Sequence, residues 1–239
     1  MTSTTRTLPT EPPTKATATA RKPRHARARA AGLLFLAAMF TYGPGSGIVA
    51  MFLEAPDSLT RLAERPLLFT SGAALMLVNS AVVVGIGVLL HPVLRAADQR
   101  VALGYLATRI IEGALLAFGV VALLALVPIA DVGGGGSADV AGVSTLATAV
   151  NDISYQVAMA TLGLGSLFFC RLLFRYQLVP GPLAMWGLVG YAIFLLGAML
   201  ELFGVPAGLA LSVPGGLFEI FFGGWLIARG FTKAQQLPA

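Results

Sequence analysis

This sequence contains very little cysteine, histidine or charge. Its 239 residues include one cysteine and two histidines, and 11% of them are charged. A single cysteine, Cys170, excludes a disulfide within the chain and a thiolate metal cluster, and we expect it to be a buried, unreactive thiol. His25 lies in a basic N-terminal segment and His91 at the end of an apolar run, so there is no intramembrane histidine pair for haem and no H-E-x-x-H zinc motif. We therefore expect no metal and no other cofactor.

Apolar residues, by contrast, are abundant and continuous. They make up 56% of the chain, and the mean hydropathy is +0.82. About 20 apolar residues suffice for a helix to cross a bilayer, and these runs are too long and too continuous for the alternating strands of a membrane barrel. The sequence predicts an all-α, polytopic membrane protein with a six-helix transmembrane domain over residues 29–230. The expected spans are 30–53, 67–92, 103–130, 152–175, 182–204 and 207–229.

The N-terminal segment differs in composition from the rest. Residues 1–31 hold seven basic residues and one acid, with many Thr, Ala and Pro. Such a segment cannot bury a core, so we expect residues 1–28 to form a disordered tail whose positive charges lie against anionic lipid headgroups. An organelle transit peptide is the alternative. Nucleic acid is not an expected partner, because no aromatic residues interleave the basic ones. Residues 231–239 are expected to form a short C-terminal tail.

Lys and Arg favour one side of the predicted topology. The opposite side holds only Arg61 and Arg65. Because basic loops stay in the cytoplasm, we expect both termini to be cytoplasmic, in a multi-pass protein of the cell membrane. The basic residues assigned to the cytoplasmic side are those of the N-terminal tail, Arg95, Arg100, Arg171, Arg175, Arg229 and Lys233.

Three ionisable residues lie inside the apolar spans. Arg109 and Glu112 occur in the third span and Glu219 in the sixth. An ionised side chain in hydrocarbon costs several kcal/mol, so such residues usually face a helix-lined interior. With a rise of about 1.5 Å per residue, the antiparallel spans bring all three to one depth, together with Asn79 of the second span. We define Arg109, Glu112, Glu219 and Asn79 as the polar layer and predict a shared intramembrane site.

The polar layer allows more than one role. Arg109 and Glu112 are three residues apart, so they can pair on one helix face, which leaves one acid over. The excess acid makes the layer a candidate proton or cation site. A purely structural interpretation is an ion-pair clasp between spans three and six, and contact with a lipid headgroup is a third.

Several shorter patterns also give expectations. Pro214, followed by Gly215 and Gly216, predicts a kinked or unwound sixth span just before Glu219, although Pro and Gly are also common in membrane helices as packing residues. Gly133 to Gly136 lack a phosphate-loop ending and predict a flexible hinge. The remaining patterns are a small-residue packing face at Gly43 and Gly47, a short capped segment opened by Asp57 and Ser58, an interfacial helix or early start of span four around Val143 and Leu146, and a helix cap at Asn151 and Asp152.

The order of motifs resembles a family of bacterial integral-membrane proteins, domain of unknown function 4386, over roughly residues 28–230. The resemblance implies an inner-membrane protein with about six helices and no established activity. The motifs that carry it are Arg29-x-x-Gly32, Leu90-His91-Pro92-Val93, Arg109-x-x-Glu112, Leu173-Phe174-Arg175 with Leu178-x-Pro180, and Pro214, Phe218-Glu219 and Trp225-Leu226 with Gly230.

Three classes of function fit the sequence. The favoured one is a structural or regulatory membrane protein, which can form homo-oligomers through its glycine-rich faces and contains an Arg-Glu-Glu cluster. The alternative is a small proton-coupled transporter or carrier that uses this cluster to bind a proton or small molecule. A membrane-embedded enzyme acting on lipid-like substrates is the second alternative, and the lack of histidine and metal motifs weighs against catalysis.

Overall fold

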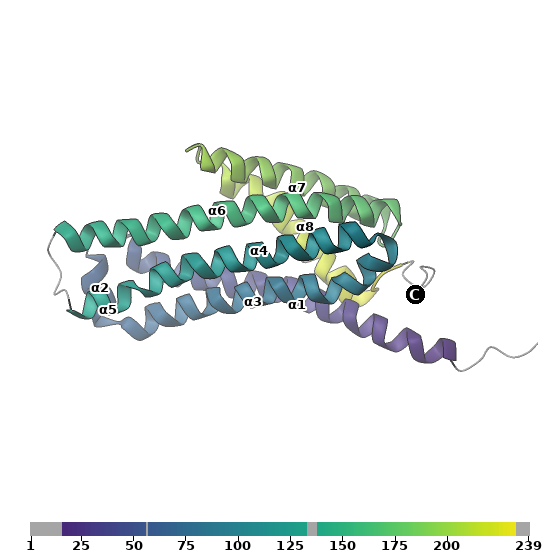
Figure 1. The fold of residues 1–239 in the computed structure, drawn as a ribbon, viewed down its shortest axis with the longest axis horizontal. Helices are drawn as coiled ribbons and strands as arrows, with labels where there is room; N and C mark the ends of the chain where they lie inside the picture. Colours follow the sequence, from purple (N-terminus) through teal and green to yellow (C-terminus); the bar gives the residue numbers. More distant parts are fainter. Residues whose placement is uncertain (1–15, 56, 133–137, 233–239) are drawn as a thin grey trace, which may run out of the picture.

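The protein is a helical bundle with six helices that are long and apolar enough to cross a membrane (Figure 1). The structure, a computed structural model, describes residues 16–55, 57–132 and 138–232, and every regular element in these ranges is a helix. The predicted all-α, six-span class is confirmed. The helices are α1 (Ala16–Leu53), α2 (Ser58–Glu64), α3 (Pro66–Ala97), α4 (Gln99–Leu124), α5 (Leu126–Val132), α6 (Ala138–Arg175), α7 (Gly181–Leu202) and α8 (Gly208–Ala228).

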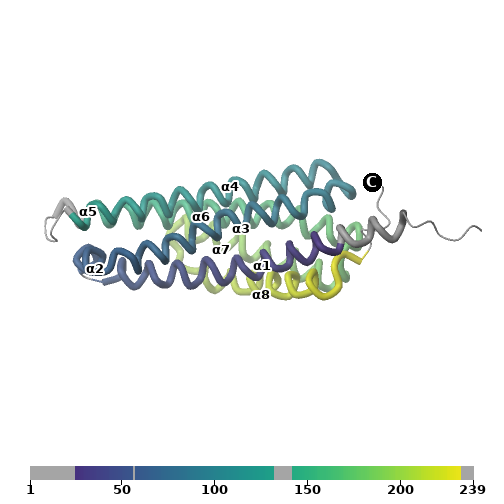
Figure 2. The backbone as a smooth tube through the Cα atoms, turned by 90° about the horizontal axis from the view of Figure 1, so that it is seen from below, coloured from purple at the N-terminus to yellow at the C-terminus, as the bar shows by residue number. Residues whose placement is uncertain are grey.

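The six long helices form a closed ring. Helix α1 packs on α3, α3 on α4, α4 on α6, α6 on α7, α7 on α8, and α8 packs back on α1. In this order α4 and α8 lie across the ring from each other, so side chains from them that point inward meet at its centre. The start of α1 and the end of α8 lie at one end of the bundle, which we call the terminal end, and α2 and α5 lie at the other, the distal end (Figures 1 and 2).

The helices of the ring differ in length. Helices α1 and α6 each have 38 residues, and α3 has 32, whereas α7 has 22 and α8 has 21. The α7–α8 hairpin therefore stops short of the distal end (Figure 1). Beyond it, the longer helices pack around a separate small core that includes Phe52, Phe69 and Leu123.

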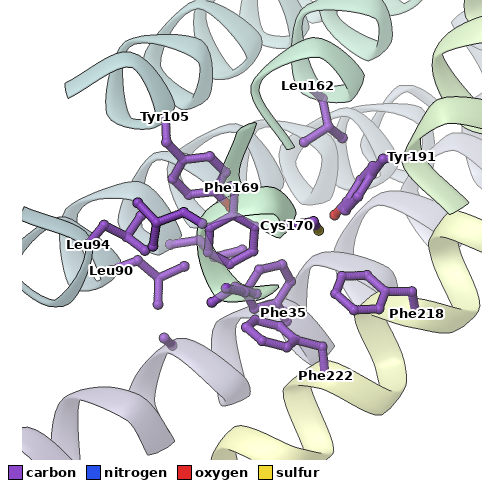
Figure 3. Close-up of a cluster of buried hydrophobic side chains, with 14 of the residues drawn as sticks. Phe35, Leu90, Leu94, Tyr105, Leu162, Phe169, Cys170, Tyr191, Phe218 and Phe222 are labelled. Carbon is purple, nitrogen blue, oxygen red and sulfur yellow. The ribbon is translucent and has the colours of Figure 1, made fainter. Parts of the chain in front are cut away.

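Toward the terminal end the ring is filled by aromatic side chains (Figure 3). The ring of Phe222 contacts Phe35 and Phe169 edge-to-face, with centroids 5.3 and 5.6 Å apart. Tyr105 stacks on Phe169 at 4.6 Å, and Phe218 on Phe222 at 5.3 Å. These five residues, which we call the aromatic cluster, join α1, α4, α6 and α8 in a well-packed layer.

The outward faces of the helices carry large apolar side chains. Phe118 is 61% exposed, Val189 52% and Phe221 58%. Such a surface is unfavourable in water and favourable against lipid. The chain is therefore a multi-pass membrane protein by length, composition and surface.

Two helices begin before the expected spans, and for α6 this agrees with the early start of span four that Val143 and Leu146 indicated as one of two alternatives. Helix α1 begins at Ala16, so the expectation of a disordered segment up to residue 28 is wrong for residues 16–28. This stretch is rich in Ala and Arg, which favour helix, and it extends an existing helix without a nucleation cost. Helix α6 begins at Ala138, so Asn151 and Asp152 lie in its interior and do not cap it. Residues 1–15, 233–239 and the glycines 133–136 lie outside the described residues.

The prolines act differently in the third and sixth spans. Helix α4 ends at Leu124 and α5 begins at Leu126, because Pro128 has no N–H to donate to the Leu124 carbonyl. Helix α8 instead continues through Pro214, Gly215 and Gly216, so the predicted unwinding does not occur. Its first residue is Gly208, so Pro214 lies only two turns from the start of the helix and disturbs few bonds.

Glycine packing also differs from the prediction. Gly43 and Gly47 have open space where a side chain would stand, so they do not form the predicted packing face. Gly45 packs instead, because a Cβ there would lie 2.8 Å from the carbonyl oxygen of Gly72 on α3. The ring is closed by a similar approach of α1 and α8, where a Cβ on Gly32 would lie 2.5 Å from the Gly223 oxygen.

The short helix α2 matches the segment predicted after Asp57. Asp57 precedes its first residue, Ser58, but its side chain makes no capping hydrogen bond to the helix. The carboxylate instead pairs with Arg61 one turn later, at 2.9 Å.

Candidate binding site at the centre of the helix ring

Arg109 on α4 points into the ring and is held on three sides. Its Nη1 donates to both oxygens of Glu112, at 3.4 and 3.2 Å, and its Nε donates to the Tyr105 hydroxyl at 3.0 Å. The guanidinium also lies over the rings of Phe35 and Tyr105, 5.5 and 5.2 Å from their centroids. Arg109 and Glu112 are each 2% exposed, so this is a buried ion pair within one helix.

The fourth side of Arg109 faces Glu219 across the ring. Its Nη2 is buried and has no hydrogen-bond partner among the described residues, and it lies 3.9 Å from Oε1 of Glu219. Glu219 Oε1 instead accepts a hydrogen bond from the Tyr191 hydroxyl of α7 at 2.5 Å. The Glu219 side chain is 14% exposed, which makes it the most accessible charge of the three.

A cavity of about 220 Å³ adjoins these charges, and we call it the central cavity. Arg109, Glu112, Glu219 and Asn79 all line it, so the structure brings the whole predicted polar layer to one place. Asn79 is 4% exposed, and its Oδ1 accepts a hydrogen bond from the Thr41 hydroxyl of α1 at 3.3 Å. The walls also include apolar side chains such as Leu116 and Met159. A small ligand in this space would contact both charge and hydrocarbon.

The aromatic cluster lies on the terminal side of the central cavity. On α1, α4 and α6, the cluster residue is nearer the terminal end than the cavity residues, as with Phe35 against Tyr42 on α1. Helix α8 shows the same order, with Phe222 on the terminal side and Gly215 on the cavity side. The aromatic cluster therefore bounds the cavity toward the terminal end.

A family model described as domain of unknown function (DUF4386) matches residues 30–230, which include every residue of the polar layer. The chain belongs to the DUF4386 family. No curated protein and no solved structure matches it. The family supplies no activity, so the function of this DUF4386 protein must be argued from the site itself.

A second cavity continues from the first toward the α7–α8 turn, and we call it the distal cavity. Its volume is about 140 Å³, and the two cavities share four lining residues, among them Tyr155 and Ser212. At its far side Glu201 accepts hydrogen bonds from the Gln156 side chain at 2.8 Å and from the Gly208 backbone N–H at 3.0 Å. The site thus extends from the polar layer toward the α7–α8 turn.

Tyrosines complete the site, and the sequence analysis did not identify them. Tyr42 and Tyr155 stack with centroids 5.2 Å apart, and both line the central cavity with Tyr191. A signal for Tyr191 was present, because it and Glu219 each lie 14 residues from Val205 in the turn between the last two spans. Antiparallel helices bring such residues to one depth. Tyr42 and Tyr155 carry no comparable signal.

The described residues contain no group of three or more His, Cys, Asp or Glu side chains placed to hold a metal ion. Cys170 is fully buried near Tyr191 and Phe169 (Figure 3). The chemistry offered by the site is therefore proton exchange, charge pairing and hydrogen bonding.

Proposed function

We propose that this protein is a small proton-coupled carrier that binds a small cation in the central cavity and exchanges it for a proton on Glu219. The observation that carries the proposal is the separation of Arg109 from Glu219. A clasp would close this gap with a hydrogen bond, whereas Nη2 of Arg109 is left without one and a cavity of about 220 Å³ adjoins the pair.

The charge of the polar layer supports a cation or proton as ligand. Arg109 compensates one carboxylate, and Glu112 is the one that it contacts directly. The second carboxylate, on Glu219, is uncompensated at a depth where charge is costly, so it requires a proton or a cation. The tyrosine rings around it provide faces that attract cations.

The difference between the two sides of the cavity supports a carrier over a channel. The aromatic cluster bounds the terminal side of the cavity, while the distal cavity leads away from Glu219 toward the α7–α8 turn. A carrier must alternate access between the two sides, so this arrangement corresponds to one of its two states.

We also propose that the terminal end faces the cytoplasm of a bacterial cell, with the basic start of the chain against anionic headgroups. The support is the distribution of Lys and Arg, since Arg61 within α2 and Arg65 directly after it lie at the distal end, whereas the other basic residues of the helix connections lie at the terminal end.

The test of the carrier proposal is Glu219→Gln in reconstituted vesicles with an internal pH-sensitive dye. This change keeps the shape of the side chain and its hydrogen bond with Tyr191 but removes the exchangeable proton. We expect cation-driven proton movement in the wild type and its loss in the variant. The matched control is Glu64→Gln, because Glu64 is exposed on α2 and far from the cavity. Equal proton movement in Glu219→Gln and the wild type would rule out the proposal.

A structural or regulatory role is the second candidate, favoured by the direct Arg109–Glu112 pair. If the layer is a clasp between α4 and α8, a double-mutant cycle in detergent with Arg109→Ala and Glu219→Gln should give a large coupling energy. We expect strong coupling of Arg109 to Glu112 and weak coupling to Glu219, because only the first pair is joined by hydrogen bonds. The formation of homo-oligomers is compatible with strong or weak coupling between Arg109 and Glu219.

A further inference from the structure

A third cavity lies at the terminal end and is separate from the polar layer. Its volume is about 830 Å³, and we call it the terminal cavity. Three separate parts of the chain form it: His25 near the start of α1, the connection from Arg175 to Gly181 between α6 and α7, and the segment from Trp225 to Thr232 at the end of α8.

Specific contacts hold these parts together. The Thr232 N–H donates to the Leu178 carbonyl at 2.8 Å, which ties the end of the described chain to the α6–α7 connection. Gln177 in that connection has a left-handed backbone, with φ of 50°. A Cβ on Gly230 would lie 2.9 Å from the His25 ring, so α1 packs directly on the end of α8. The cavity is thus built by the fold.

Among the described residues, the cavity wall offers hydrogen-bond donors and positive charge but no carboxylate. Arg175 and Arg229 both line it, and neither forms an ion pair with any acid in the described part of the chain. The indole Nε1 of Trp225, which also lines it, is buried and lacks a hydrogen-bond partner there. A basic residue at a helix C-terminus is expected from the helix dipole alone. Two arginines from the ends of different helices in one cavity wall indicate an anion with several acceptor oxygens.

The position of the cavity indicates the source of that anion. Arg175 is the last residue of one candidate span, and Arg229 directly follows another, so both lie at the depth of the lipid headgroups. Phe174, 45% exposed, and Phe231 provide apolar wall beside the arginines. We propose that the terminal cavity binds the phosphate group of an anionic phospholipid, with Arg175 and Arg229 as its ligands. This site is independent of the carrier proposed above.

The experiment is native mass spectrometry of the full chain in a neutral detergent with added phosphatidylglycerol or phosphatidylcholine. We expect one phosphatidylglycerol to be retained in preference to phosphatidylcholine. The double variant Arg175→Gln/Arg229→Gln should weaken that binding roughly 30-fold, since each basic residue near a headgroup contributes about 1 kcal/mol. The matched control is Arg95→Gln/Arg100→Gln, which removes the same charge from the same end of the bundle but not from the cavity.

Two results would overturn the proposal. Equal weakening by the two double variants would show only diffuse attraction to a basic surface. Binding of inorganic phosphate alone, with displacement of the lipid and the same sensitivity to Arg175→Gln/Arg229→Gln, would assign the site to a soluble phosphate compound. Thermal unfolding of each variant in detergent checks that its fold is retained. Arg175→Lys keeps the charge, so it should weaken lipid binding less than Arg175→Gln/Arg229→Gln does.

Discussion

The two sides of Arg109 are built from the same six helices yet differ in packing. On the terminal side, Phe169 and Phe222 fill the ring with stacked and edge-to-face aromatic contacts. On the distal side, α8 presents Ser212, Gly215 and Gly216, and the ring contains the central cavity. The small residues of α8 thus leave space for the cavity directly beside the layer that the large aromatic residues fill. The buried charges lie at the boundary, where they are anchored by the packed side and face the hollow side.

The rate at which an introduced thiol is labelled tests this contrast between the two sides of Arg109, and we expect the largest effect here. Cys170 is the only native thiol and is fully buried, so the wild type should not react with a small cationic thiol reagent in membranes. Ser212→Cys places a thiol on the central cavity, and Ser166→Cys places one at a fully buried position on α6. We expect labelling of Ser212→Cys at least tenfold faster than that of Ser166→Cys, measured by mass shift. Equal rates would mean that the cavity is not accessible.

Truncation of an aromatic side chain should cost more on the packed side. Phe222→Ala removes a fully buried ring that contacts three other aromatic residues, so we expect the free energy of unfolding in detergent to fall by about 3 kcal/mol. Phe194→Ala at the cavity wall only enlarges an existing space and should cost about 1 kcal/mol. Similar losses would contradict the contrast between the two sides.

Replacing glycine with alanine should change the free energy of unfolding in opposite directions at two positions of α1. Gly32→Ala forces a Cβ to within 2.5 Å of the Gly223 oxygen, and we expect it to lower the free energy of unfolding by about 2 kcal/mol. Gly43→Ala meets open space within a helix, so it should raise stability by about 0.5–1 kcal/mol. Denaturant titrations of both variants give the comparison. If Gly43→Ala is destabilising, Gly43 packs closely against a neighbouring helix, as the sequence predicted.

The smallest expected effect concerns the hydrogen bond at the boundary. Tyr191→Phe removes the donor to Glu219, so we expect a loss of about 1 kcal/mol in the free energy of unfolding. In vesicles the same variant should change proton movement more than Tyr155→Phe, since Tyr155 lines the cavity without a hydrogen bond to Glu219. If the two variants behave alike, Tyr191 has no special part in holding Glu219.

Much of the fold and the polar layer could be predicted from the sequence because both depend on depth. Apolar runs define the spans, and the fixed rise of a helix brings Arg109, Glu112 and Glu219 level. Other features depend on contacts between helices, which depth does not specify. The ring order, the cavity beside Glu219 and the stacking of Tyr42 on Tyr155 belong to this class. The helix start at Ala16 lies in basic, polar sequence, where hydropathy gives no signal.

The closure of the ring between the first and last helices has a consequence for biogenesis. During synthesis α4 enters the membrane before α8 exists, so Arg109 cannot yet face Glu219. Its pairing with Glu112, three residues away on the same helix, compensates its charge at insertion. The cavity is then completed only when α8 arrives and Gly223 meets Gly32 on α1. A chain truncated before α8 would therefore still insert α4 into the membrane but would lack the complete central cavity.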